Sequence, residues 1–264
     1  MLKATDLRLT FNPGTPIETQ ALRGMSLEIP TGQFVTVIGS NGAGKSTFLN
    51  AVSGEQKVDS GTIEIDGIDM TRQPVWGRAR HVARVFQDPL AGTCEDLTIE
   101  ENMALAKMRG ERRGFSFAVK PALREEFRAQ LSTLGLGLEN RLSDRIGLLS
   151  GGQRQAVSLL MAALQPSRLL LLDEHTAALD PRTAAFVLEL TVRIVAEHKL
   201  TTMMVTHSMR QALDVGQRTV MLHQGRVVLD VSGKEREGLD VHHLLDMFEK
   251  VRGEKIDDDA LLLG

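Results

Sequence analysis

A strand signal, a glycine-rich loop and a helix signal follow one another between residues 34 and 52. Phe34–Ile38 is a continuous apolar run, and a helix-like segment begins at Ser46. Glycines in such a loop allow backbone N–H groups to point inward, where they can cradle phosphate oxygens. This order predicts an α/β protein built around a phosphate-binding loop. The loop consists of Gly39, Ser40, Asn41, Gly42, Ala43, Gly44, Lys45, Ser46 and Thr47.

Two side chains of this loop carry its chemistry. Lys45 would supply a fixed positive charge to the β- and γ-phosphates of a nucleotide, and Ser46 is placed to ligate magnesium. The alternative is an ordinary glycine-rich turn capped by a serine. The full spacing of the loop and the strand before it favour the nucleotide site.

A second strand signal ends in two carboxylates. The apolar run Leu169–Leu172 is followed directly by Asp173 and Glu174. Nucleotides bind at the carboxyl edge of open α/β sheets, so Asp173 would join the magnesium site and Glu174 would polarise the attacking water. A core strand ending in solvated acids would look the same in isolation. The phosphate loop makes the catalytic interpretation the stronger one.

Single polar residues follow two further strand signals. Gln87 comes after the strand-like run Val82–Phe86, where its amide could contact both magnesium and the nucleophilic water. His207 comes after the strand-like run Thr201–Val205, where its imidazole could hydrogen-bond the γ-phosphate. Alone, Gln87 would be an ordinary surface residue and His207 a histidine satisfied at a strand end.

The peptide Leu149–Gln153 begins a helix. Ser150 is expected to be its N-cap, and Gln153 would complete a capping box. Gly151 and Gly152 leave the N–H groups of the first turn bare, and such a helix start is suited to receive a phosphate. An ordinary capped helix is the alternative.

Composition limits the classes of protein that remain. The net charge of -3 gives no support to general nucleic-acid binding. Cys94 is the only cysteine, which excludes an intrachain disulfide or a multi-cysteine metal cluster. The N-terminus meets Asp6 before any apolar core, so no secretory signal is expected. No apolar run is long enough to span a bilayer, so a transport path would belong to another polypeptide.

These segments resemble the ABC ATPase family across essentially the whole chain. The loop at 39–47 matches Walker A, and Asp173 with Glu174 matches Walker B. Gln87 stands at the Q-loop, residues 149–153 read as the LSGGQ signature, residues 178–180 as the D-loop, and His207 as the H-loop. The resemblance implies a P-loop NTPase core of the ABC type that hydrolyses ATP with Mg²⁺.

The resemblance also implies an organisation of the chain as one domain over residues 1–264. The RecA-like core, with an N-terminal antiparallel β subdomain, would comprise about 1–96 and 165–235. An inserted helical signature subdomain would cover about 97–164, where strand signals vanish. Residues 236–264 would form a C-terminal helix and a solvated tail that includes Asp257–Asp259.

Partners and binding residues follow from the same resemblance. The family forms head-to-tail homodimers with composite ATP sites, so Ser150, Gly151, Gly152 and Gln153 of one subunit would cover the phosphate held by Lys45 of the other. Phe11 matches the position of an aromatic ring against adenine. Transmembrane permease subunits and an extracytoplasmic substrate-binding protein are the expected further partners, with no nucleic acid. The subunit would be cytoplasmic, on the inner face of the inner membrane.

One position departs from the family pattern. His175 stands where family members usually have proline. The run from Glu174 to Asp180 resembles an importer branch tied weakly to tryptophan or tyrosine uptake. His175 is interpreted as a simple exposed substitution in preference to a titrating gate.

Three classes of function remain to be compared. The leading one is the ATPase subunit of a bacterial membrane transporter, an importer. A soluble ABC ATPase that assembles iron–sulfur clusters is the main alternative. A module that senses ATP without hydrolysing it is disfavoured by Glu174.

Overall fold

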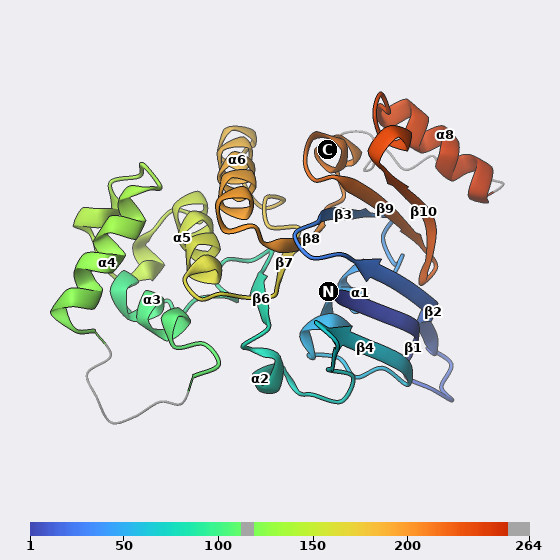
Figure 1. The fold of residues 1–264 in the computed structure, drawn as a ribbon, viewed down its shortest axis with the longest axis horizontal. Helices are drawn as coiled ribbons and strands as arrows, with labels where there is room; N and C mark the ends of the chain where they lie inside the picture. Colours follow the sequence, from blue (N-terminus) through green and yellow to red (C-terminus); the bar gives the residue numbers. More distant parts are fainter. Residues whose placement is uncertain (112–118, 253–264) are drawn as a thin grey trace. The chain divides into compact units, whose positions relative to one another are not determined.

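The computed structural model describes residues 1–111 and 119–252 (Figure 1). The chain forms two compact units. Among the described residues, one unit comprises residues 1–78 and 200–252, and the other comprises residues 79–111 and 119–199. The expected tail with Asp257–Asp259 lies outside the described residues.

The first unit contains the expected antiparallel sheet. Its strands run in the order β2-β1-β4-β5. Leu2 pairs with Ile29 on one side and with Ile65 on the other, and all three side chains are buried. The strands are β1 (Leu2–Phe11), β2 (Thr19–Ile29), β4 (Ser60–Ile65) and β5 (Ile68–Asp69).

A second group of strands in this unit carries the phosphate loop. Its order is β10-β9-β3-β8, with β3 parallel to both neighbours and β10 antiparallel to β9. Every residue of β3 and β8 is buried. The strands are β3 (Phe34–Ile38), β8 (Thr201–Val205), β9 (Arg218–His223) and β10 (Arg226–Ser232).

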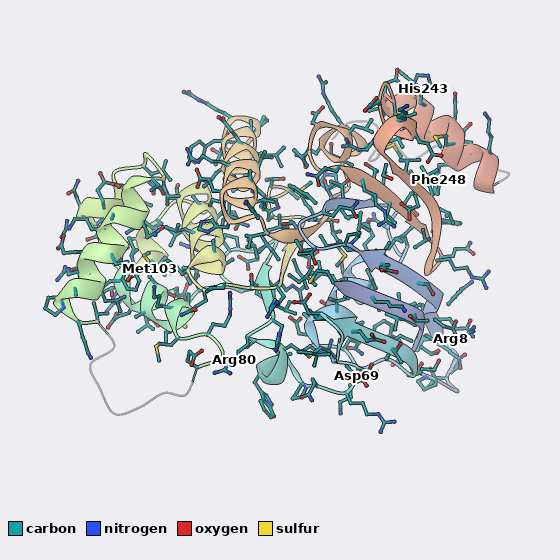
Figure 2. The ribbon with its side chains drawn as sticks, in the orientation of Figure 1. Arg8, Asp69, Arg80, Met103, His243 and Phe248 are labelled. Carbon is teal, nitrogen blue, oxygen red and sulfur yellow. The ribbon has the colours of Figure 1, made fainter. Side chains whose placement is uncertain are left out.

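Helices complete the first unit. Ile38 of β3 and Met221 of β9 form a core together with Leu244 and Phe248 of the last helix. Figure 2 shows Phe248 pointing from that helix toward the strands. The helical segments are α1 (Lys45–Ser53), α2 (Val75–Arg78), α7 (Met209–Asp214), η3 (Gly233–Glu235) and α8 (Val241–Arg252).

The second unit pairs two parallel strands with the helical segment expected from the sequence. Met103 and Phe127 are buried in its helical part, and Met103 is labelled in Figure 2. The strands are β6 (Val82–Val85) and β7 (Leu169–Asp173). The helical segments are α3 (Ile99–Lys107), α4 (Pro121–Ser132), η1 (Leu138–Asn140), η2 (Ile146–Leu148), α5 (Gly151–Ala163) and α6 (Pro181–His198).

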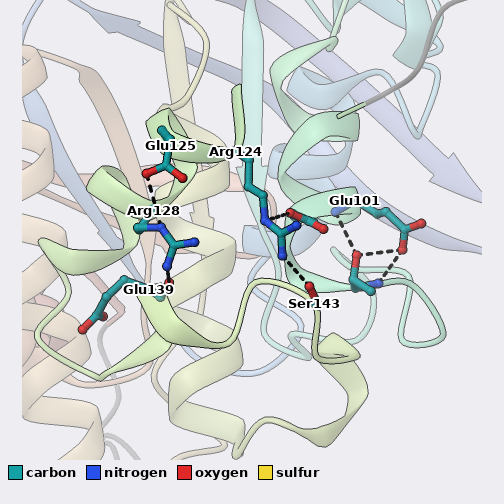
Figure 3. A network of polar contacts seen from close by, with 8 residues as sticks. Glu101, Arg124, Glu125, Arg128, Glu139 and Ser143 are labelled. Atoms are coloured by element: carbon teal, nitrogen blue, oxygen red, sulfur yellow. Dashed lines mark hydrogen bonds and ion pairs between the residues drawn. The ribbon is translucent and has the colours of Figure 1, made fainter. Parts of the chain in front are cut away.

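Polar contacts join the helices of this part (Figure 3). Arg124 of α4 pairs with Glu100 of α3 at 3.0 Å and donates to the Ser143 hydroxyl at 2.5 Å. Arg128 donates to the carbonyl oxygen of Glu139 at 2.9 Å. Glu100 is the more buried partner of the ion pair, so this contact fixes α4 against α3 more than a fully exposed pair would.

Candidate functional site

The phosphate loop has the backbone that its glycines predict. Gly44 has φ 99° and precedes α1 as its N-cap, with no side-chain hydrogen bond to the helix start. A Cβ on Gly44 would lie 2.8 Å from the carbonyl oxygen of Ala21, and one on Gly39 would lie 2.3 Å from that of Leu222. Only glycine fits these close approaches, and the helix start offers N–H groups to an anion.

The Lys45 side chain lies inside its own loop. It is 7% exposed, and its Nζ donates to the carbonyl oxygens of Gly39 at 2.7 Å and Ser40 at 3.3 Å. The ammonium group is therefore held at the loop in which phosphate would bind. Ser46 follows it in the first turn of α1.

His207 lies at the same edge of the strands as the loop. Val37 of β3 and Val205 of β8 are paired in a parallel register; β8 ends at Val205 and β3 ends one residue after Val37. The amide of Thr206 donates to the Val37 carbonyl at 3.1 Å. The structure thus brings His207 and the phosphate loop together within the first unit.

Phe11 ends β1 on the strand pair that borders the loop. It is half-buried and faces Thr19 of β2 in the antiparallel register. Two residues further along β2, Ala21 makes the close approach to Gly44 described above. The placement is compatible with a ring near a bound nucleotide.

In the second unit, parallel strands bring Gln87 and the two acidic residues to one edge. Val85 of β6 pairs with Leu172 of β7, so Gln87 follows the end of β6 next to Asp173, the last residue of β7. The Asp173 carboxylate accepts a hydrogen bond from Arg84 at 2.6 Å. The same guanidinium lies over the Phe86 ring, 4.6 Å from its centroid. Sequence reasoning missed Arg84.

The predicted capping box at the signature helix is confirmed. The backbone amide of Gln153 donates to Ser150 Oγ at 3.3 Å, and the backbone amide of Ser150 donates to the side-chain Oε1 of Gln153 at 3.1 Å. A Cβ on Gly152 would lie 2.1 Å from a methyl carbon of Thr183, so this glycine allows α5 to approach the first turn of α6. The helix start is therefore both capped and closely packed.

A buried amide joins α5 to the segment before Gln87. Gln155 is fully buried, and its Nε2 donates to the carbonyl oxygen of Phe86 at 3.1 Å. The structure thus connects the signature helix with the predicted Q-loop inside one unit. Sequence reasoning did not identify Gln155.

The candidate magnesium ligands fit that ion by their chemistry. Ser46 offers a hydroxyl, Gln87 an amide oxygen and Asp173 a carboxylate, which are the hard oxygen donors that Mg²⁺ prefers. Across residues 1–111 and 119–252, no group of three or more His, Cys, Asp or Glu could hold a metal ion. Mg²⁺ commonly uses one or two carboxylates together with substrate phosphates.

His175 is not the exposed substitution that the sequence suggested. It is 2% exposed, and its Nε2 lies 2.9 Å from Thr191 Oγ1 of α6. Burial lowers the pKa of His175 from 6.5 to about 4. The turn after β7 directs this side chain into the interior, which the local sequence pattern did not predict.

The lowered pKa of His175 predicts a loss of stability in acid. The unfolded chain would bind a proton near pH 6.5, whereas the folded chain would resist protonation down to about pH 4. Stability is therefore full above pH 6.5 and falls as pH drops through this window. We expect the free energy of unfolding to be about 2 kcal/mol lower at pH 5 than at pH 7.5 from this group alone.

Urea unfolding at these two pH values measures the effect. His175→Gln should flatten the pH dependence, whereas substitution of the exposed His198 by glutamine should leave it unchanged. An equal slope in the wild type and His175→Gln would contradict the expectation.

The predicted site residues fall into two groups. The first unit holds Phe11, the loop at 39–47 and His207; the second holds Gln87, the signature at 150–153, and Asp173 with Glu174. Within the first unit His207 and the loop share one edge of the parallel strands, and within the second Gln87 shares an edge with Asp173 and Glu174.

Comparisons with known proteins match this chain to one family. Residues 22–177 match the family model for the ABC transporter. The tyrosine transport ATP-binding protein of Clostridioides difficile is 45% identical over 254 residues, which cover 94% of this chain and 99% of that protein. An aliphatic sulfonates import ATP-binding protein of Agrobacterium fabrum is 34% identical over 213 residues, which cover 81% of this chain and 74% of that protein.

A solved structure supports the same fold. A dimeric ATP-binding cassette in a post-hydrolysis state, bound to ADP and phosphate, matches with a TM-score of 0.74 and 28% identity. The match covers 88% of this chain and 98% of the other. The cassette fold expected from the sequence is therefore confirmed.

Proposed function

This chain belongs to the ABC transporter family of ATPases, and from that premise we propose that it is the ATP-hydrolysing subunit of a bacterial importer. The observation that carries the proposal is that one chain holds a phosphate loop and a capped signature helix. The named relatives support the transport role, since they are ATP-binding proteins for tyrosine transport and for sulfonate import.

The proposed reaction transfers the γ-phosphoryl group of ATP to water. Lys45 and the loop amides bind the β- and γ-phosphates, and Phe11 stacks on the adenine ring. Glu174 accepts the proton of the attacking water, while Gln87 and His207 orient the water and the phosphate. Mg²⁺, held by Ser46, Gln87 and Asp173, would neutralise phosphate charge.

We propose that the active form is a head-to-tail homodimer, and the signature helix supports this proposal. A helix start of this kind, with glycines at positions 151 and 152, is suited to receive a phosphate. We place them at the γ-phosphate bound by Lys45 of the partner subunit. ATP would close the dimer, and hydrolysis with phosphate release would open it.

The proposed membrane partners complete the importer. None of the helices within the described residues is long and apolar enough to cross a membrane. We propose that transmembrane permease subunits bind the helical segment within about 97–164, and that a substrate-binding protein delivers the cargo outside. The subunit would then lie on the cytoplasmic face of the inner membrane. An aromatic amino acid is the proposed class of cargo, on the strength of the tyrosine relative.

Copurification separates this proposal from a soluble role in iron–sulfur cluster assembly. A tagged chain, extracted from its native membranes in mild detergent, is expected to retain an integral membrane permease. A matched Lys45→Ala chain should retain it too, because the proposed contact does not require ATP. Recovery of a soluble scaffold in place of a permease would contradict the importer.

A further inference from the structure

We propose that His175 is a positioning residue for Glu174, and that it acts through the hydrogen bond between its imidazole and Thr191 of α6. The inference rests on the proposed role of Glu174 in ATP hydrolysis. It assigns a function to a buried side chain that the proposed mechanism does not otherwise use.

The hydrogen-bond chain has a defined direction. Thr191 Oγ1 donates its proton to the carbonyl oxygen of Val187 at 2.8 Å, within α6. A threonine hydroxyl has only one proton, so in its contact with His175 at 2.9 Å it accepts. The proton therefore resides on Nε2 of His175, which fixes the tautomer and the orientation of the ring.

Burial makes this contact specific. His175 is 2% exposed and Thr191 is fully buried, so no bulk water can replace either partner. A buried polar group that loses its partner is costly, whereas a satisfied one selects a single arrangement. The contact thus holds the residue after Glu174 at one place on α6.

Glu174 needs such a restraint because its backbone is strained. Its φ is 43°, in the left-handed region that residues other than glycine seldom adopt. A conformation of this kind persists only where the surroundings over-determine it. The turn itself contributes one restraint, since the amide of Ala177 donates to the Glu174 carbonyl at 2.9 Å.

Along the chain, His175 lies between two other segments that are held in place. Upstream, Leu172 of β7 is held in the ladder with β6. Downstream, Asp180 caps α6 by accepting from the Thr183 amide at 3.1 Å. His175 lies in between and connects the turn to the middle of α6. Without it, the turn after Glu174 would lose its attachment to α6 and the backbone of Glu174 would shift, and a small displacement of a catalytic group lowers the rate strongly.

The test compares three variants of the full chain in ATP hydrolysis. His175→Leu fills the buried space with an apolar side chain but removes the N–H donor. Thr191→Val removes the hydroxyl acceptor with little change in shape. His175→Gln keeps an N–H donor at a similar distance. We expect the His175→Leu and Thr191→Val variants to lose about tenfold in kcat with KM and ATP affinity unchanged, and the His175→Gln variant to retain most of kcat.

Controls separate positioning from general loss of stability. Thr202→Val alters another fully buried threonine, in β8, and should lower the melting temperature without lowering kcat. The double variant His175→Leu with Thr191→Val should be no slower than either single variant, because both remove one contact. If His175→Leu does not fold, the near-isosteric Thr191→Val decides the question alone.

The outcomes distinguish this inference from the proposed function. A wild type that does not hydrolyse ATP, or a Glu174→Gln variant with wild-type turnover, would overturn the proposed function. An active wild type with a slow Glu174→Gln variant, but with wild-type kcat in Thr191→Val, would overturn the positioning role alone. A rise in KM at unchanged kcat would also overturn it.

Discussion

Glu174→Gln is expected to lower the rate of ATP hydrolysis by at least about a hundredfold while ATP binding is retained. Glutamine has nearly the shape of glutamate but lacks a carboxylate that can accept the proton of the attacking water. The residue follows β7 at the edge shared with Gln87. The effect should therefore appear in kcat rather than in KM, since binding depends on the phosphate loop.

Steady-state phosphate release measures the rate of hydrolysis, and a fluorescent ATP analogue measures ATP binding. Glu189→Gln is the matched control, because it makes the same change at an exposed position of α6. We also expect Glu174→Gln to accumulate as a closed dimer with ATP, visible by light scattering after size exclusion. Turnover close to wild type would refute the assignment of Glu174 as the base.

The strands that carry the candidate site could be predicted from sequence because they are buried on both sides. Phe34–Ile38 and Thr201–Val205 match β3 and β8 to the residue. Such strands are rich in apolar and β-branched residues along their whole length and end at polar residues. Their ends hold the functional residues, so the same pattern located both the fold and the site.

Three elements, β10, α2 and α7, were not predicted. β10 is mostly exposed or half-buried and is paired to β9 only, so its sequence carries little alternation. α2 and α7 span only four and six residues, which is too short for a helical period to emerge. Their stability comes from tertiary contacts, such as Met209 of α7 in the core beside Phe248.

Within the candidate site, contacts between residues close in the sequence could be predicted, whereas contacts between distant residues could not. The capping box of Ser150 and Gln153 could be predicted because its partners are three residues apart. Arg84 and Asp173 are separated by 89 positions, and Gln155 and Phe86 by 69. His175 was wrongly expected to be exposed because its burial depends on α6, which the residues around Glu174 do not reveal.

Two inactive variants are expected to restore ATP-dependent dimerisation when they are mixed. Lys45→Ala should weaken ATP binding about a hundredfold, since it removes a charged partner of the phosphates. Ser150→Asp keeps a good N-cap for α5 but places a negative charge against the γ-phosphate. In a Glu174→Gln background, each variant alone should remain monomeric with ATP.

The mixture should form heterodimers with one intact composite site. That site would combine Lys45 of the Ser150→Asp subunit with Ser150 of the Lys45→Ala subunit. Differently tagged subunits and ATP-dependent pull-down detect this species. Ser150→Thr is the matched control, because it keeps the capping hydroxyl without adding charge, and it should dimerise alone. If Lys45 and Ser150 served a site within one chain, every subunit of the mixture would carry a damaged site and no heterodimer would form. An absence of ATP-dependent heterodimers would therefore refute the head-to-tail arrangement. Their formation would require the signature helix of one subunit to contact the phosphate bound by the other.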